Sequence, residues 1–177
     1  MGGDSGGGAV GLSFAPPRLE HFGPLVLAGR RKCHALDRER LAVYADIALQ
    51  WREFVAEAPV IPALPPRRGY GVSLHTAEGV NGLDYFCGFV VAQRDDVPTG
   101  FDVLEIPLLT MAVFEHPDHI SHLRGTVALI YGTVLPMAGI EPVPAAESAL
   151  DFVQRYTDAF DPVSGFGGIE VLVPVKV

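Results

Sequence analysis

The chain has 177 residues, 49% of them hydrophobic and 19% charged, which is typical of one folded domain with a substantial core. Its formal net charge of −8, with 13 lysines and arginines, argues against nucleic-acid binding, because phosphate contacts need a clustered basic surface. No apolar run approaches the ~20 residues of a membrane-spanning helix, and the chain starts without an apolar secretory segment. We therefore expect a cytoplasmic protein without membrane contacts.

Glycine dominates the start of the chain, and we expect residues 1–17 to form a flexible tail ahead of a single domain over 18–177. The two cysteines, Cys33 and Cys87, have no metal-binding spacing. The functional residues are therefore to be sought among the other side chains of the domain.

The first half of the domain reads as strand, helix, strand, strand. Residues 18–34 mix apolar and polar positions and predict a strand that is interrupted at Gly23-Pro24. In 38–57, apolar side chains recur every three or four residues, which predicts an amphipathic helix. Two short strands follow, over 70–75 and 83–92.

The second half repeats this order. Residues 101–116 predict a strand with Pro107 inside it, and 120–134 predict a second amphipathic helix. The stretch 147–156 is compatible with a short helix or a strand, and the strand is favoured because the first half has one there. The β-branched residues of 169–177 predict the final strand.

The halves, 18–94 and 101–177, therefore indicate a duplicated βαββ unit. Two similar halves that pack about a pseudo-twofold axis leave a cleft at their junction. Clefts of this kind are preferred sites for small ligands.

Glu170 is an acid within the otherwise apolar stretch 168–175 of the final strand. It is either an exposed acid beside a turn or a buried one, which would recognise a cationic ligand or have a raised pKa for proton transfer. Alignment of the two halves places Tyr85 opposite Glu170. If both line the cleft, Tyr85 supplies a ring face and a hydroxyl, and Glu170 supplies charge.

Several aromatic residues are candidates for the walls of such a cleft. Trp51 is the only tryptophan, and its helical spacing suits core packing as well as ligand binding. An aromatic cage around one acid would bind lipophilic cations through cation–π attraction. The weaker candidates of the same kind are Tyr44, Phe86, Phe114, Tyr156 and Phe160.

The evenly spaced His116, His119 and His122 raise the alternative of a zinc site. Pro117 separates the first of them from the following helix, so the three need not share a face, and we expect no metal. No motif in the sequence predicts a cofactor.

Taken in order, several segments resemble the GyrI-like small-molecule-binding domain, also called the AraC-type or multidrug-regulator effector-binding domain. The resemblance covers the chain from about residue 19 to its end. The matching segments are 50–54 (QWREF), 70–72 (YGV), 83–88 (LDYFCG), 106–107 (IP), 112–116 (AVFEH) and 168–175 (GIEVLVPV).

This resemblance implies an α+β fold with tandem βαββ repeats, an antiparallel sheet with two helices on one face, and a ligand cleft between the halves. It also implies that Glu170 is the pocket carboxylate and that Trp51 and Tyr85 are pocket aromatics. Many members of the family carry a DNA-binding domain ahead of this fold, and we expect the present chain to be a stand-alone module.

Three functions are compatible with these features. The first is a binding module for lipophilic, cationic or aromatic small molecules. The second, implied by some stand-alone relatives, is a hydrolase of reactive cyclopropane-type genotoxic compounds that uses Glu170 and Tyr85. The third is a protein-binding module of the gyrase-inhibitor kind. No feature of the sequence assigns an oligomeric state.

Overall fold

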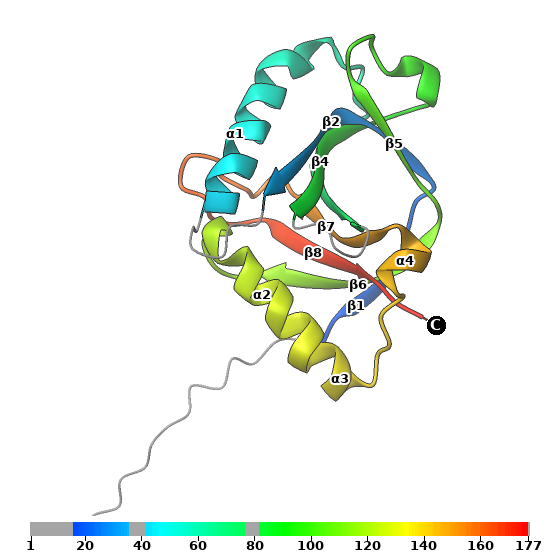
Figure 1. Cartoon of the computed structure of the whole chain (residues 1–177), viewed down its shortest axis with the longest axis vertical. Helices are drawn as coiled ribbons and strands as arrows, with labels where there is room; N and C mark the ends of the chain where they lie inside the picture. Colours follow the sequence, from blue (N-terminus) through cyan, green and yellow to red (C-terminus); the bar gives the residue numbers. More distant parts are fainter. Residues whose placement is uncertain (1–15, 36–41, 77–81, 177) are drawn as a thin grey trace, which may run out of the picture.

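The protein is built on one antiparallel sheet. A computed structural model describes residues 16–35, 42–76 and 82–176, so the tail expected over 1–17 falls largely outside the described residues. In this part of the chain eight strands form the order β1-β6-β8-β7-β3-β4-β2-β5, and every neighbouring pair is antiparallel. Helices pack against the sheet (Figure 1), which confirms the expected α+β class.

The first half contains the predicted elements. They are β1 (Arg18–Phe22), β2 (Leu25–Ala35), α1 (Ala42–Glu57), the short turn η1 (Ala58–Val60), β3 (Gly69–Leu74) and β4 (Gly82–Val91). Gly23-Pro24 divides the expected first strand into β1 and β2, because proline lacks the N–H group that a continuous ladder requires. The two pieces then pair with different neighbours, β1 with β6 and β2 with β4 and β5.

The second half has the same order. Its elements are η2 (Arg94–Asp96), β5 (Asp102–Ile106), β6 (Leu109–His116), η3 (Ile120–His122), α2 (Leu123–Leu129), η4 (Ile130–Val134), α3 (Leu135–Ala138), α4 (Ala145–Ser148), β7 (Leu150–Tyr156) and β8 (Ile169–Pro174). Helices α2 and α3 are continuous through the π-helical turn η4, and Gly139 ends this segment in the left-handed conformation, with φ 65°. The stretch 147–156 was expected to be a short helix or, preferably, a strand. Most of it forms strand β7, and only its first two residues belong to helix α4.

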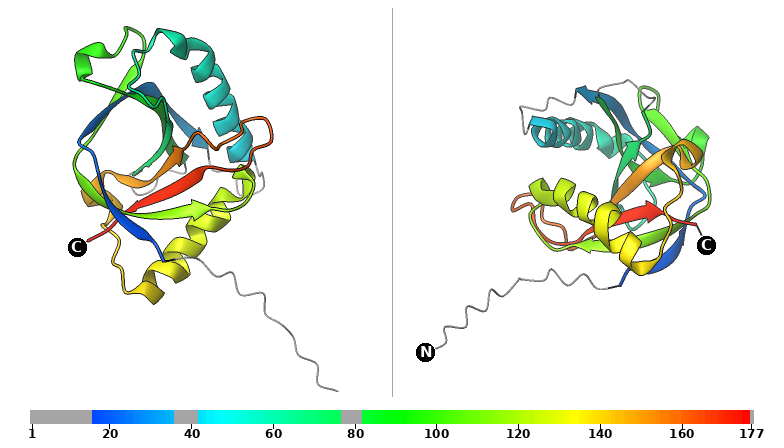
Figure 2. Two further views of the ribbon diagram at one scale, coloured as in Figure 1. Left: turned by 180° about the vertical axis from the view of Figure 1, so that it is seen from behind. Right: turned by 60° about the horizontal axis from the view of Figure 1, so that its bottom comes forward.

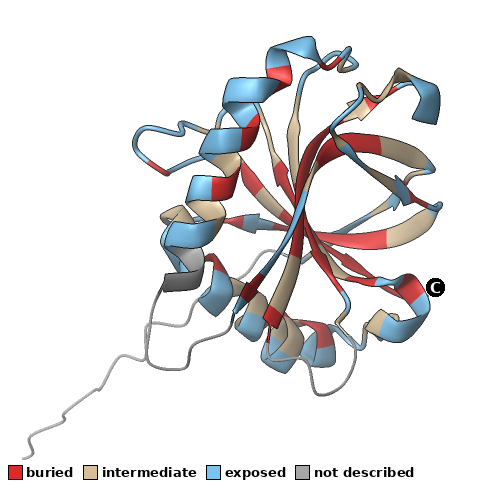
Figure 3. Cartoon of the chain, turned by 45° about the horizontal axis from the view of Figure 1, so that its top comes forward, coloured by how far each residue is buried: buried red, intermediate tan, exposed pale blue. Residues whose placement is uncertain are grey.

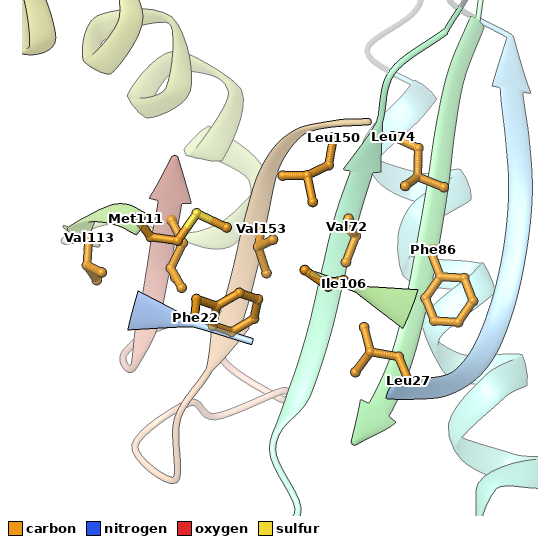
Figure 4. Close-up of a cluster of buried hydrophobic side chains, with 11 residues drawn as sticks. Phe22, Leu27, Val72, Leu74, Phe86, Ile106, Met111, Val113, Leu150 and Val153 are labelled. Carbon is orange, nitrogen blue, oxygen red and sulfur yellow. The ribbon is translucent and has the colours of Figure 1, made fainter. Parts of the chain in front are cut away.

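The two halves are interleaved in the sheet. β3 and β7 meet at its centre, while β1 is added to the second half through β6 and β5 to the first half through β2. The sheet curls around a core of apolar side chains on one of its faces (Figures 2 and 4). Members of this core include Phe22, Leu27, Val72, Phe86, Ile106, Met111, Val153 and Leu172.

The opposite face carries the helices. The register places Cys87, Gly71, Gln154 and Val171 in one row across the four central strands, so these four positions share a face of the sheet. Cys87 belongs to the cluster that includes Phe54 of α1, and Val171 belongs to the cluster that includes residues of α2 and α3. Both helical segments therefore cover this one face, each with a buried stripe toward the sheet (Figure 3). In the described residues no helix is both long and apolar enough to cross a membrane.

Two opposed glycines allow β2 and β4 to approach closely. Gly29 and Gly88 are direct partners in the register. A Cβ atom on Gly29 would lie 2.0 Å from the carbonyl oxygen of Cys87, and one on Gly88 would lie 2.6 Å from that of Ala28. Because these neighbours are backbone atoms, a larger residue could be accommodated only by moving a strand.

We therefore expect Gly29→Ala to lower the free energy of unfolding by roughly 1–3 kcal/mol, the usual cost of overpacking. Urea unfolding followed by circular dichroism measures this change. Gly125→Ala is the matched control, because a Cβ atom there meets nothing within 4 Å, and the substitution lies in helix α2. It should leave stability unchanged or raise it by about 0.5–1 kcal/mol. Equal effects of the two substitutions would contradict the close approach.

Candidate ligand-binding site

A cavity of about 900 Å³ lies between the two helical segments on the helix-covered face. Its walls come from α1, the start of α2, strands β3, β4 and β7, and the segment that joins β7 to β8. The apolar and aromatic members of the wall include Ile47, Trp51, Val55, Leu83, Tyr85, Phe89, Leu123, Val127, Phe152, Tyr156 and Phe160. The cavity therefore spans the junction of the two halves.

Three aromatic rings pack edge to face or tilted along one wall. The centroids of Trp51 and Tyr156 are 5.2 Å apart, and those of Tyr156 and Phe160 are 4.8 Å apart. Gly69 lies beneath this group, where a Cβ atom would approach the Trp51 ring to 3.0 Å. Because each ring is held by its neighbours, the wall has a defined shape before any ligand enters.

A hydrogen-bonded group lies at the base of the same wall. The Trp51 Nε1–H donates to Tyr85 Oη at 3.0 Å, and the Tyr85 hydroxyl donates to Gln154 Oε1 at 2.8 Å. The Tyr156 hydroxyl donates to the same Gln154 oxygen at 2.9 Å. Burial raises the pKa of Tyr85 well above its ordinary value, so the phenol stays neutral. A Cβ atom on Gly71 would lie 1.9 Å from Tyr85 Oη, so this group needs a glycine at that position.

The charged groups of the wall differ in their exposure. Asp151 of β7 is half-buried, and its Oδ2 atom accepts a hydrogen bond from Ser73 Oγ at 3.2 Å. Arg52 of α1 and Arg124 of α2 also line the cavity, but both side chains are exposed. Among the described lining residues Asp151 is the acid, and the sequence-based prediction missed it. The available signal was a single acid between Leu150 and Phe152, which is the same signal that drew attention to Glu170.

The structure brings together part of the predicted site. Trp51, Tyr85, Tyr156 and Phe160 all line the cavity. Phe86 lies in the core on the opposite face of the sheet, and Phe114 is buried beneath α2 and α3. The side chain of Tyr44 falls outside the described residues.

Glu170 is placed away from the cavity, contrary to expectation. Its side chain lies on the same face as Leu172, in the strand where alternate residues point to opposite faces. Arg155 Nε donates to Glu170 Oε2 at 2.6 Å, and Arg18 donates to Oε1. Arg155 also donates to Glu20 through Nη1 at 2.6 Å. Burial by itself would raise the pKa of Glu170, but the hydrogen bonds from the two arginines outweigh it and hold this pKa below its usual value.

The sequence-based assignment of Glu170 to the cavity failed because of an error in strand alignment. Tyr85 points toward the helices and its neighbour Phe86 points away, on the same face as Leu172. An alignment that equates Tyr85 with Glu170 is therefore shifted by one residue, and such a shift moves a side chain to the other face of the sheet. The two residues assigned to a hydrolytic reaction consequently lie on opposite faces.

The three histidines have hydrogen-bond partners of their own. His116 Nδ1 lies 2.8 Å from Thr126 Oγ1, and His122 Nδ1 lies 2.7 Å from Asp118 Oδ2. The described residues contain no group of three side chains placed to hold a metal ion.

Solved structures of other proteins share this fold. SAV2435 bound to tetraphenylphosphonium has a TM-score of 0.65 at 17% identity, over 92% of this chain and 94% of that one. An integron cassette protein of Vibrio cholerae has a TM-score of 0.60 at 11% identity, over 92% and 97%. EcmrR in a complex with DNA has a TM-score of 0.62 at 16% identity, over 90% of this chain and 56% of that one. No curated protein matches the sequence at a significant level.

A curled antiparallel sheet with a cavity between two helical segments on one face defines the GyrI-like effector-binding domain, as the resemblance in the sequence implied. Residues 19–175 match the family described as Cass2, integron-associated effector binding protein. The chain belongs to this family.

The buried ion pairs of Glu170 lead to a prediction about stability. Glu170→Gln removes one of the two carboxylates that Arg155 contacts, while Glu20 remains as a partner, so we expect the substitution to cost about 1–3 kcal/mol at pH 7. The pKa of Glu170 is lowered in the folded state, so its contribution is present above the usual value of 4.5 and is lost as the pH falls through the lower folded value. The difference from the parent should therefore shrink at acidic pH, which urea unfolding at several pH values measures.

Glu105→Gln is the control for this experiment, because the Arg94–Glu105 pair, at 3.1 Å, is exposed on both sides. Such surface pairs contribute about 0–1 kcal/mol. The structural role of Glu170 would be contradicted if the two substitutions had similar effects.

Proposed function

We propose that the protein binds lipophilic aromatic cations in the cavity between α1 and α2. The observation that carries this proposal is a 900 Å³ space walled by aromatic rings, with half-buried Asp151 in its wall. Ligand sites of this size are mostly apolar, with a few polar groups that fix orientation. Trp51 and Tyr156 offer ring faces or edges to an aromatic ligand, and such rings also attract a delocalised cation.

The proposed preference for cations over anions follows from how far the charged residues of the cavity wall are exposed. Arg52 and Arg124 lie in the exposed part of the wall, where water and salt screen their charges. Asp151 is half-buried, so its negative charge acts more strongly on a ligand inside the cavity. The likeness in fold to SAV2435, which is described with bound tetraphenylphosphonium, supports the same ligand class.

We also propose that this effector-binding domain functions in the cytoplasm and does not itself contact nucleic acid. The net charge of −8 supports this part of the proposal. A gel-shift experiment with random duplex DNA at low salt should show no complex.

Two probes of the same shape and opposite charge test the ligand class. Tetraphenylphosphonium and tetraphenylborate each carry four phenyl rings around one charge. Trp51 is the only tryptophan and lines the cavity, so its fluorescence reports occupancy of this site. We expect the cation to quench this fluorescence with about tenfold higher affinity, a difference of about 1.4 kcal/mol. Tighter binding of the borate would show that the two arginines dominate, and no response to either would refute the proposal.

Asp151→Asn isolates the source of the preference. We expect it to weaken tetraphenylphosphonium binding about tenfold and to leave neutral triphenylphosphine oxide unaffected, because only the charge is removed. Glu170→Gln tests the sequence-based alternative, in which Glu170 is the counter-charge. It should leave both affinities unchanged at pH 7, since its side chain lies on the other face of the sheet. A loss of cation binding in Glu170→Gln but not in Asp151→Asn would reverse the assignment.

A further inference from the structure

A second, smaller cavity adjoins the first. Its volume is about 390 Å³, and its walls come from α2, the π-helical turn η4, the segment before β7, and β7 itself. Val127, Asp151 and Phe152 line both cavities. These three residues therefore lie between the two spaces.

The outer wall of the smaller cavity is held in place by backbone contacts. The Val143 N–H donates to the Pro174 carbonyl oxygen at 2.8 Å, and Pro142 forms a β-bridge with Val175. On the other side, Tyr131 in η4 donates through its hydroxyl to the Asp151 carbonyl oxygen at 2.5 Å. π-helical turns within α-helices are frequent at functional sites, and this one places an aromatic ring in the wall.

The smaller cavity has the chemistry and size for an aromatic group. Apart from Asp151, its described wall consists of aliphatic and aromatic side chains and prolines. An apolar cavity of about 150 Å³ suffices to bind benzene, so 390 Å³ has room for a phenyl ring. Asp151 lines both spaces, so this residue lies at their boundary.

We infer that the protein takes elongated ligands, in which a cationic aromatic head occupies the larger cavity and a second aromatic group reaches past Asp151 into the smaller one. The inference rests on the proposed function, because it assigns the head group to the same site. The second aromatic group adds buried apolar area without adding charge. It therefore raises affinity independently of the ion pair with Asp151.

Two probes that differ only at the end of a tail test this inference. Butyltriphenylphosphonium carries the head and a short tail, and (4-phenylbutyl)triphenylphosphonium adds a terminal phenyl ring. We expect the second compound to bind the parent protein about tenfold more tightly, as judged by Trp51 fluorescence. Equal affinities would overturn the inference.

Ala145→Phe locates the tail. Ala145 lines the smaller cavity only, so a phenyl side chain there should fill the space that the tail needs. It should abolish the tenfold gain and leave butyltriphenylphosphonium binding unchanged. Ala146→Phe is the matched control, because Ala146 is exposed, is the next residue of α4 and belongs to neither wall, and it should keep the gain.

The remaining outcomes are also decisive. A gain that persists in Ala145→Phe, or an equal loss of both compounds, would overturn the placement of the tail. If Ala145→Phe lowers the midpoint of thermal unfolding, Ala145→Leu repeats the test with a smaller side chain. If neither compound binds the parent protein, the proposed function itself fails, which is distinguishable from equal binding of the two.

Discussion

The Tyr85 hydroxyl lies against the backbone of Gly71, and the architecture of the cavity depends on this contact. A Cβ atom at position 71 would lie 1.9 Å from the phenolic oxygen, so only glycine leaves room for it. From this position the hydroxyl reaches Gln154 on β7, across the central junction of β3 and β7. It also accepts the hydrogen bond of Trp51 from α1. One phenol thus connects a helix and both halves of the sheet at the base of the cavity.

One face of the sheet carries an ion-pair network, and the other face carries the ligand cavity. On the face away from the helices, Arg155 is hydrogen-bonded to Glu20 of β1 and Glu170 of β8, so the network ties the edge strand to the centre of the sheet. Buried ion pairs contribute little net stability compared with apolar packing, but they penalise any arrangement that leaves one charge alone. They therefore favour one register for β1. The helix-covered face is then free to enclose an apolar space.

The sequence predicted the elements well, because each depends on local patterns. Three local features are evident in the sequence alone. They are the apolar spacing in α1, the prolines that divide the first strand of each half, and the β-branched residues of the final strand. Which face a strand residue occupies depends on register, and register is set by pairing with distant strands. This is why Glu170 was assigned to the wrong face, whereas Trp51 lies on helix α1, whose apolar spacing is evident in the sequence. Asp151 had an equivalent pattern, and only the fold distinguishes the two acids. The duplication of the two halves and the domain boundaries drawn from it stay predictions.

The hydrogen bonds at the base of the cavity bear on ligand selectivity. The Trp51 N–H and the Tyr85 hydroxyl hydrogen already have acceptors within the protein, and Gln154 Oε1 receives two donors. A ligand therefore need not supply polar groups in a fixed geometry, and no strong penalty excludes compounds that lack them. Sites that require specific hydrogen bonds discriminate steeply between analogues, whereas apolar pockets discriminate weakly. The shape of the aromatic wall and the charge of Asp151 are then the remaining sources of selectivity. This combination supports the proposed binding of aromatic cations as a chemical class rather than of a single compound.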